Sequence, residues 1–389
     1  MTDRTKTLFD RRPVEDWLES EQAAGRLSGG VMEIRQAGST VFFQTFGTKD
    51  PEGTPVAADT AYWIASMTKP IVSVAAMRLV EQGRLRLSDP VRSFIPGFGE
   101  NGVLSDDGAL VDAVRPPLIQ DLMTHLSGVT YGQFGNEDIH ARYMEARVYD
   151  FFSDNARMAA RLSELPLLHQ PGTVFEYGMS TDLLGRVIEV VTGTALDSAL
   201  RDLVLDPLGM NDTRFLPDPD RIAAIPPSPT QRALAPPLTP EQTWFSGGGG
   251  LCSTVPDYMR FAEMLRQGGA LEGVRLLRSE TLTSMLRDYL PADVGYGSYT
   301  GGLGITAPTP ENGLGFGLGF AVRTERRNYL PGGLAGGLGE FLWPGVSGAN
   351  FWVDPENDLI AVFLTHAPEH RGQHRIGFRN AVYAGLKQD

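Results

Sequence analysis

Ser66 and Lys69 lie three residues apart in YWIASMTKPI, a stretch that is mostly apolar apart from its lysine. If the stretch is helical, this spacing puts the two side chains on one face, within reach of each other. A serine hydroxyl becomes a nucleophile when a base within hydrogen-bond distance removes its proton. The pair therefore has the residue types and spacing that a serine nucleophile and its partner in proton transfer would need.

Lysine is scarce in this chain, which makes Lys69 conspicuous. Of the 34 Lys and Arg residues only four are lysines, namely Lys6, Lys49, Lys69 and Lys387. Arginine stays protonated in proteins, whereas a lysine in an apolar setting can lose its proton and act as a base. A helix cap followed by a solvated lysine has the same spacing, so the pair alone leaves both interpretations open.

Five segments in order extend this pair to a family resemblance. They are SMTK at 66–69, THLSG at 124–128, YGMS at 177–180, PLGMNDT at 207–213 and SGGGGLCSTVPDYMRF at 246–261. Together they resemble the serine β-lactamase and penicillin-binding-protein superfamily. Within it the sequence is most similar to the family VIII carboxylesterases, which share the class C β-lactamase fold, and the resemblance covers about residues 25 to 385.

The resemblance implies a role for each matching position. Ser66 would be the nucleophile, and Lys69 and Tyr177 would relay its proton. The segment Trp343-Pro344-Gly345 stands where β-lactamases carry Lys-Thr-Gly and family VIII esterases carry Trp-Gly-Gly. By that alignment the backbone N–H groups of Ser66 and Val346 would form the oxyanion hole.

Two departures from the family pattern bear on the substrate. Met179 stands where class C enzymes have an asparagine, which weakens the case for recognition of a lactam amide. No lysine lies between residues 70 and 386, so the lysine that helps β-lactamases hold the substrate carboxylate is missing. Both departures favour an ester over a penicillin-like anion.

Several residues near the motifs could line a pocket for the acyl or alcohol part of a substrate. They are Tyr131 and Phe134 in GVTYGQFG, Trp244 before the glycine run, and Trp343 and Gly345 in the WPG segment. Aromatic side chains are more often part of a hydrophobic core. Core packing is therefore the alternative for each aromatic residue in this set.

The sequence gives little support for a metal site or for a different hydrolase fold. His366, His370 and His374 are spaced four apart, but Pro368 and Gly372 interrupt any helix that would align them. We therefore expect surface histidines and no metal. The pentapeptide G-x-S-x-G does not occur in the chain, which argues against an α/β-hydrolase.

The elements that would position the site follow from hydrophobic periodicity. Helices are expected over 13–25, from Ser66 to Gln82, from residue 255 and over 372–386. A hairpin is expected at 30–38 and 40–47, and three β-like stretches at 315–324, 339–355 and 358–366. Residues 86 to 245 read as mostly helical, with proline-rich joints.

This order predicts an α/β (α+β) fold of the β-lactamase/transpeptidase type. Its antiparallel sheet would be built from N- and C-terminal segments, flanked by helices, with a mostly helical insertion. The expected domains are residues 1–85 with 246–389, which form the sheet, and residues 86–245, which contribute Tyr177 to the cleft.

Composition indicates which partners the protein is expected to bind and in which cellular compartment it is expected to work. The net charge of −13 is spread without a basic block, which disfavours nucleic acid and anionic membranes as partners. The N-terminus has no apolar signal region and there is no run of eighteen apolar residues. With Cys252 as the only cysteine no internal disulfide can form, so we expect a cytoplasmic protein.

The leading hypothesis is thus a serine carboxylesterase that acts on small, neutral, short-acyl esters without a cofactor. One group of alternatives acts on amides: a β-lactamase, a D-amino-acid peptidase or an amide-oligomer hydrolase. An acyltransferase, in which an alcohol replaces water, is a third possibility. A catalytically silent binding protein on the same fold is the fourth.

Overall fold

A seven-stranded antiparallel sheet organises the molecule. The computed structural model describes residues 9–105, 107–132, 138–229, 234–325 and 335–386. The strands lie in the order β11-β12-β13-β14-β15-β1-β2, and every neighbouring pair is antiparallel. Their bounds are β1 Gly29–Gln36, β2 Ser39–Gly47, β11 Leu314–Phe316, β12 Ala321–Arg323, β13 Phe341–Leu342, β14 Asn350–Asp354 and β15 Leu359–Thr365. The predicted sheet from both ends of the chain is confirmed.

The C-terminal part supplies five strands to this sheet, where three β-like stretches were predicted. The stretch 315–324 divides into β11 and β12 because it turns at Gly319, whose φ of +94° suits glycine. The stretch 339–355 divides into β13 and β14, and the residues between them form a loop. That loop carries the WPG segment. Its Pro344 has no backbone N–H and therefore cannot donate a hydrogen bond to a neighbouring strand.

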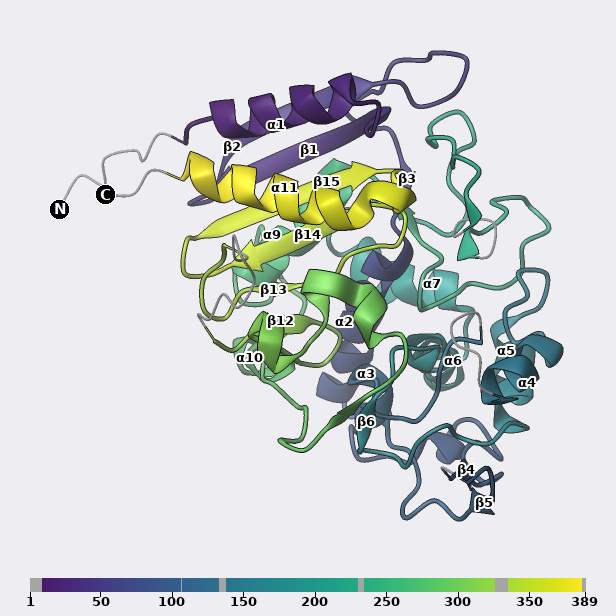
Figure 1. The fold of residues 1–389 in the computed structure, drawn as a ribbon. Coiled ribbons are helices and arrows are strands. Elements are labelled where there is room, and N and C mark those ends of the chain that lie inside the picture. Colours follow the sequence, from purple (N-terminus) through teal and green to yellow (C-terminus); the bar gives the residue numbers. More distant parts are fainter. Residues whose placement is uncertain (1–8, 106, 133–137, 230–233, 326–334, 387–389) are drawn as a thin grey trace.

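Helices cover both faces of the central strands. Every residue of β14 and β15 is buried, as expected for strands covered on both faces. On one face, α1 (Arg12–Ala23) and α11 (Arg371–Gly385) lie side by side (Figure 1). Trp17 of α1 and Phe378 of α11 both pack against Phe363 of β15. On the other face, α9 (Val255–Arg266) places Tyr258 against Phe351 of β14.

Helix α2 (Thr68–Glu81) passes through the interior between the sheet and the remaining helices. All of its residues from Thr68 to Met77 are buried, so this part of the helix is enclosed on all sides rather than on one face only. It packs against α6 (Ser180–Thr192) and the short helix α7 (Leu196–Leu200). The nucleophile candidate at its start is therefore carried by a rigid, fully enclosed element.

The remaining described elements are short. The helices are η1 Ala65–Met67, η2 Val91–Ser93, α3 Ile119–Met123, α4 Asp138–Glu145, α5 Asn155–Ser163, η3 Arg201–Leu205, α10 Ser279–Met285, η4 Thr300–Thr306, η5 Pro310–Asn312 and η6 Pro368–His370. The strands are β3 Tyr62–Trp63, β4 Val103–Leu104, β5 Leu110–Val111, β6 Val174–Phe175, β7 Cys252–Ser253, β8 Ala270–Leu271, β9 Val274–Arg275 and β10 Gly295–Tyr296. Much of 206–228 and 235–251 runs as loop, so the predicted insertion is less helical than expected. Its division from the sheet as a separate domain stays a prediction.

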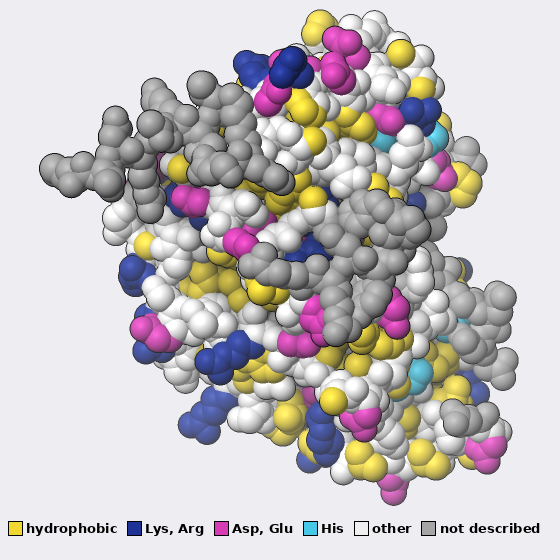
Figure 2. Space-filling view, turned by 60° about the vertical axis from the view of Figure 1, so that its left-hand side comes forward, with side chains coloured by type: hydrophobic (Ala, Val, Ile, Leu, Met, Phe, Trp, Pro, Cys, Tyr) yellow, Lys and Arg dark blue, Asp and Glu magenta, His cyan; other side chains and the backbone are white. Residues whose placement is uncertain are grey.

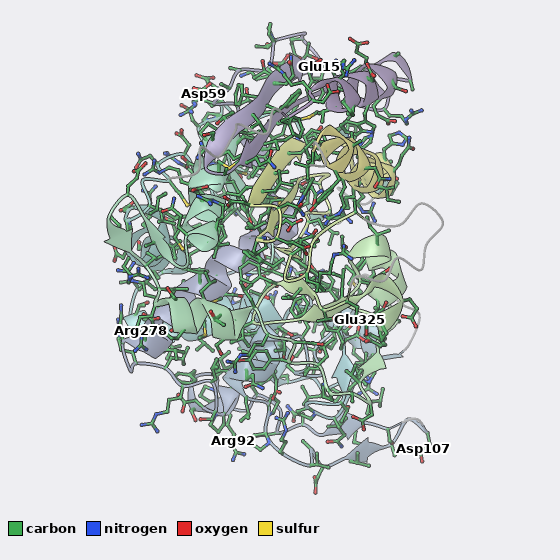
Figure 3. The ribbon with its side chains drawn as sticks, turned by 90° about the vertical axis from the view of Figure 1, so that its left-hand side faces the viewer. Glu15, Asp59, Arg92, Asp107, Arg278 and Glu325 are labelled. Atoms are coloured by element: carbon green, nitrogen blue, oxygen red, sulfur yellow. The ribbon has the colours of Figure 1, made fainter. Side chains whose placement is uncertain are left out.

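Many charged side chains lie on the outside of the molecule. Asp59, Arg92 and Arg278, from three distant segments, lie at its periphery (Figure 3). On the face drawn in Figure 2, cationic and anionic side chains are interspersed. Among the described residues, no helix combines the length and the apolar character needed to cross a membrane.

Two of the three C-terminal histidines are buried, so the prediction of surface histidines is wrong for them. His366 accepts a hydrogen bond from the Trp63 N–H (3.1 Å) and lies 3.1 Å from the Ala224 carbonyl, to which its other ring nitrogen can donate. His374 lies 3.2 Å from Glu21, and only His370 is exposed. Across the described residues, no group of three His, Cys, Asp or Glu could hold a metal ion.

Buried His366 should make stability depend on pH. Burial lowers the pKa of His366 from 6.5 to about 4. Between these values the unfolded chain binds a proton that the folded chain does not, so the free energy of unfolding falls as the pH drops from 6.5 to 4. We expect His366→Gln to lose less stability than the wild type over this interval, by up to about 3 kcal/mol. Urea unfolding at pH 7.5, 5.5 and 4.5 measures the difference, and parallel pH curves would contradict it.

Candidate active site

Ser66 lies in the 3₁₀ turn η1, directly before α2. Its predecessor Ala65 has a φ of +46°, a left-handed conformation that is uncommon for residues other than glycine. The flanking backbone is fixed on both sides: the Ile64 N–H donates to the Leu251 carbonyl (3.0 Å), and the Tyr258 hydroxyl donates to the Met67 carbonyl (2.9 Å). Such a conformation persists where the surroundings determine it, and it often marks a functional site.

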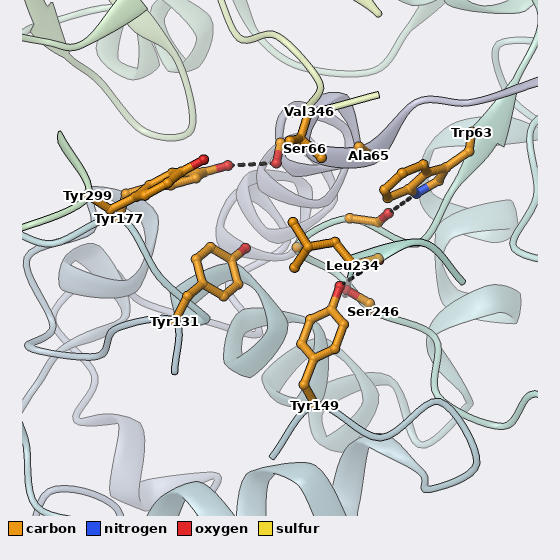
Figure 4. Close-up of a pocket in the computed structure, with 12 residues that line it drawn as sticks. Trp63, Ala65, Ser66, Tyr131, Tyr149, Tyr177, Leu234, Ser246, Tyr299 and Val346 are labelled. Carbon is orange, nitrogen blue, oxygen red and sulfur yellow. Dashed lines mark hydrogen bonds between the residues drawn. The ribbon is translucent and has the colours of Figure 1, made fainter. Parts of the chain in front are cut away.

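The structure brings Ser66, Lys69 and Tyr177 into contact. The Lys69 amine lies 3.2 Å from the Ser66 hydroxyl oxygen, and the Tyr177 hydroxyl lies 2.6 Å from it (Figure 4). Ser66 is half-buried, whereas Lys69 is 1% exposed. The spacing of the serine and lysine suggested their contact, and the family resemblance implied that Tyr177 would join them. The fold brings this tyrosine, 111 residues further along the chain, to the same hydroxyl.

Lys69 has two further oxygen partners. Its amine donates to the Gly248 carbonyl (2.5 Å) and to the Tyr131 hydroxyl (3.0 Å). A protonated amine can donate to all three oxygens, including that of Ser66. A neutral amine can donate to Gly248 and Tyr131 and still accept a proton from Ser66 with its lone pair. The arrangement thus suits both protonation states that a proton relay passes through.

Asp182 holds the Gly248 backbone beside Lys69. Its carboxylate accepts hydrogen bonds from the Gly248 N–H (3.0 Å) and the Ser246 hydroxyl (2.5 Å). Burial raises the pKa of the Asp182 carboxyl above its ordinary value, and the charge of Lys69 opposes that shift. The carboxylate therefore acts on Lys69 both through its charge and through the Gly248 carbonyl that it positions.

Aromatic rings enclose the Tyr177 phenol. The Trp343 indole N–H donates to the Tyr177 hydroxyl (3.3 Å), and the Tyr299 ring stacks on Tyr177 with centroids 5.9 Å apart. The ring of His125 lies 4.9 Å from that of Tyr177. Burial lowers the pKa of His125 well below its ordinary value, so this histidine is neutral and packs against Tyr177 instead of exchanging protons.

The WPG loop lies against the turn that carries Ser66. Val346 lines the same pocket as Ser66, and its backbone N–H has no hydrogen-bond partner among the described residues. Gly345 donates to the Ala349 carbonyl (2.8 Å) and accepts from Arg375 (2.8 Å), which fixes the loop on both sides. An unpaired N–H next to the nucleophile is what an oxyanion hole requires.

Replacement of Gly345 by alanine should displace this loop. A Cβ at this position would lie 2.3 Å from the Ile64 carbonyl oxygen, which belongs to the turn before Ser66. We expect Gly345→Ala to lower kcat for ester hydrolysis by about 10²–10³-fold, as loss of one oxyanion donor does, with a smaller change in KM. Steady-state kinetics measure this. Gly301→Ala, where nothing lies within 4 Å of the added carbon, is the matched control, and equal kcat values would contradict the role of the loop.

The pocket around Ser66 is lined largely by aromatic and apolar side chains. Tyr131 and Trp343 line it, as predicted candidates, and so does Val346. Trp244 is fully buried and packs behind Tyr149 rather than lining the pocket, so its position speaks against direct substrate contact. Phe134 falls outside the described residues.

Several lining residues were missed by sequence reasoning. They are Trp63, Tyr149, Leu234, Tyr299, Arg371 and Arg375. Most come from segments that the motifs do not mark, and Tyr299 stands in a glycine-rich stretch that reads as a turn. Arg371 and Arg375 did carry a signal, since their spacing of four on the final helix puts them on one face.

Comparison with known proteins agrees with the fold. The family model described as Beta-lactamase matches residues 14–384. Protein Rv1367c of Mycobacterium tuberculosis is 36% identical over 360 residues, covering 89% of this chain and 88% of the relative. Esterase EstB of Burkholderia gladioli is 29% identical over 392 residues, covering 92% and 91%.

A solved structure extends the likeness to three dimensions. EstCE1, described as a hydrolase with promiscuous acyltransferase activity, superposes with a TM-score of 0.76 at 26% identity, covering 96% of this chain and 98% of the other. The predicted fold class is thereby confirmed. The chain belongs to the beta-lactamase family and is a serine hydrolase of the beta-lactamase fold.

Proposed function

We propose that this protein is a serine carboxylesterase that hydrolyses short-acyl esters through an acyl-enzyme on Ser66. The observation that carries the proposal is that one hydroxyl, Ser66, contacts both the Lys69 amine (3.2 Å) and the Tyr177 phenol (2.6 Å) at a pocket. A nucleophile needs a base within this distance, and a leaving group needs a proton donor.

The reaction proceeds in two acyl-transfer steps. The Ser66 oxygen attacks the ester carbonyl while its proton passes to the Lys69–Tyr177 pair, and the carbonyl oxygen is held by the N–H groups of Ser66 and Val346. The tetrahedral intermediate expels the alkoxide, which takes the proton from the pair and leaves as the alcohol. Water then attacks the acyl-Ser66 ester by the same relay, and Ser66 regains its proton. The indole N–H of Trp343 favours negative charge on the Tyr177 oxygen during each transfer.

Ester substrates are favoured over lactams and other amides. The chain has no lysine between residues 70 and 386, and Met179 replaces the asparagine of class C enzymes. EstB is described as an esterase and EstCE1 as a hydrolase, which supports the same class here. Faster turnover of nitrocefin than of p-nitrophenyl esters would instead favour a β-lactamase.

Acyl transfer to an alcohol is the second candidate function. EstCE1 is described as having promiscuous acyltransferase activity, and the pocket beside Ser66 offers Trp63, Tyr149 and Leu234 as an apolar surface for an alcohol. An alcohol bound there would compete with water for the acyl-enzyme. Analysis of products formed from p-nitrophenyl butyrate in the presence of added alcohols separates transfer from hydrolysis.

Trapping of the acyl-enzyme tests the proposal directly. Reaction with a fluorophosphonate or a slow ester should add one acyl or phosphonyl group to the protein, detected by intact mass. Peptide mapping should place the group on Ser66. Absence of labelling, or labelling elsewhere, would refute the covalent mechanism and would favour a catalytically silent binding protein.

A further inference from the structure

A second part of the cleft leads from Ser66 to two arginines of α11. It shares Ser66, Tyr177 and Val346 with the apolar pocket and continues past Trp343 to Arg371 and Arg375. A groove of about 240 Å³ beyond Leu303 and Ile376 is lined by the same two arginines and also by Glu369, which forms no ion pair within 4.0 Å with either arginine. The guanidinium groups therefore lie between the nucleophile and an open groove.

Arg375 is a buried cation without a counter-ion. It is 7% exposed, and its guanidinium donates to the Gly345 carbonyl (2.8 Å), while its Nε has no hydrogen-bond partner in the described protein. Burial lowers the pKa of Arg375 to about 10, and the nearby charge of Arg371 acts in the same direction. An unpaired buried charge is expensive, so such groups normally face an anion.

Arg371 adds a second positive charge at the same place. It is half-buried and donates to the Pro368 carbonyl (2.6 Å). No Asp or Glu among the described residues lies within 4.0 Å of either guanidinium, although 47 acidic residues occur in the chain. The pair is thus a cationic patch left open toward the reacting ester.

We propose that Arg371 and Arg375 form an anion-binding subsite, and that the ester this protein hydrolyses carries a carboxylate that binds there. The inference rests on the proposed esterase function and specifies its substrate. A guanidinium can donate two parallel hydrogen bonds to one carboxylate, which gives orientation as well as affinity. The sequence alone favoured a neutral ester because the WPG segment has no lysine, but α11 brings a cation to the carbonyl of that same segment.

The arginines could instead serve only to clamp the WPG loop. A clamp would affect carboxylate-bearing and neutral esters alike, because the loop acts on the ester carbonyl common to both. A subsite would affect only the carboxylate-bearing ester. The ratio of kcat/KM between matched esters therefore separates the two roles.

Two matched ester pairs test the subsite and locate it. In the first pair, 4-acetoxybenzoate and 4-acetoxybenzamide, the carboxylate belongs to the leaving alcohol. In the second, the 4-nitrophenyl monoester of glutaric acid and 4-nitrophenyl butyrate, the carboxylate belongs to the acyl group. We expect kcat/KM to favour the carboxylate member of at least one pair by about 10- to 100-fold, as a charge-assisted hydrogen bond allows. Arg371→Gln and Arg375→Met should reduce that ratio toward one, and Arg375→Lys should keep part of it.

Controls cover folding and net charge. Arg157→Gln removes an exposed arginine of α5 and should leave the ratio unchanged. Thermal unfolding shows whether each variant is folded, and added glutarate or 4-hydroxybenzoate should raise the unfolding temperature of the wild type more than that of Arg375→Met.

Each result decides between the subsite and the esterase proposal. If Ser66-dependent hydrolysis occurs but neutral esters are preferred in both pairs, or the arginine variants keep the wild-type ratio, the subsite is refuted and the esterase stands. If no ester is hydrolysed, the esterase proposal falls. Arg375-dependent stabilisation by a carboxylate would then still support the subsite, and its absence would overturn it.

Discussion

Ser66→Ala is expected to abolish ester hydrolysis, lowering kcat/KM for p-nitrophenyl acetate by at least about 10⁴-fold. Without the hydroxyl no covalent intermediate can form, and the oxyanion hole and the relay have no attacking group to serve. The methyl group of alanine fits where the serine Cβ lies, so folding should be retained. Initial rates with p-nitrophenyl acetate and butyrate measure the loss.

The control for this variant is Ser73→Ala on α2, the helix that follows the turn of Ser66. The Ser73 hydroxyl is buried in α2 and has no hydrogen-bond partner in the described structure, so its removal should cost neither stability nor activity. Comparable turnover by Ser66→Ala and the wild type would exclude Ser66 as the nucleophile. Loss of activity in Ser73→Ala as well would show that α2 is sensitive to any change.

Tyr177→Phe is expected to reduce kcat by about 10²–10⁴-fold while KM changes much less. The substitution removes only the hydroxyl that lies 2.6 Å from Ser66, whereas the ring keeps its packing against His125, Tyr299 and Trp343. Without the Tyr177 hydroxyl, the departing alkoxide loses one of the two groups of the Lys69–Tyr177 pair that could give it a proton. Steady-state kinetics with p-nitrophenyl butyrate and with a poorer leaving group, ethyl butyrate, measure the effect, which should be larger for the ethyl ester.

Tyr289→Phe provides the matched deletion of a hydroxyl away from the cleft. Its hydroxyl pairs with Ser284 of α10 (2.9 Å), so kinetics should remain those of the wild type. If Tyr177→Phe retained wild-type kcat for both esters, the relay would reduce to Lys69 alone. In that case the close Ser66–Tyr177 contact would serve only to orient the hydroxyl.

The sequence was sufficient to predict the main elements of the fold, because they depend on local patterns. The helix at the C-terminus was expected over 372–386 and runs over Arg371–Gly385, and the hairpin of β1 and β2 lies where alternation and a short turn placed it. Strand number was less predictable. A glycine turn at 317–319 and the WPG loop each interrupt a β-like stretch, and neither break changes the local hydrophobicity.

Contacts between side chains from distant segments could not be predicted from local sequence patterns. The pairing of Lys69 with Gly248 depends on how Asp182 of α6 holds a loop more than sixty residues away, and no pattern marks that contact. His366 looked exposed because polar residues and a proline follow it, yet it is enclosed by Trp63 and Ala224. Arg371 and Arg375 looked like ordinary residues of a final helix, and only the path of α11 across the WPG loop brings them to the cleft.

The pairing of β1 with β15 determines when during synthesis this enzyme can become active. Gly30 pairs with Thr365 and Gln36 with Leu359, so one edge of β1 must wait for more than three hundred further residues before β15 leaves the ribosome, whereas β2 covers its other edge at once. Contacts of such sequence separation close slowly, and an unpaired strand is prone to association with other chains. The turn that carries Ser66 is made early, but the loop that would hold the oxyanion is made near the end. A nascent chain should therefore gain hydrolase activity only once both the WPG loop and β15 have emerged, and should benefit from chaperones until then.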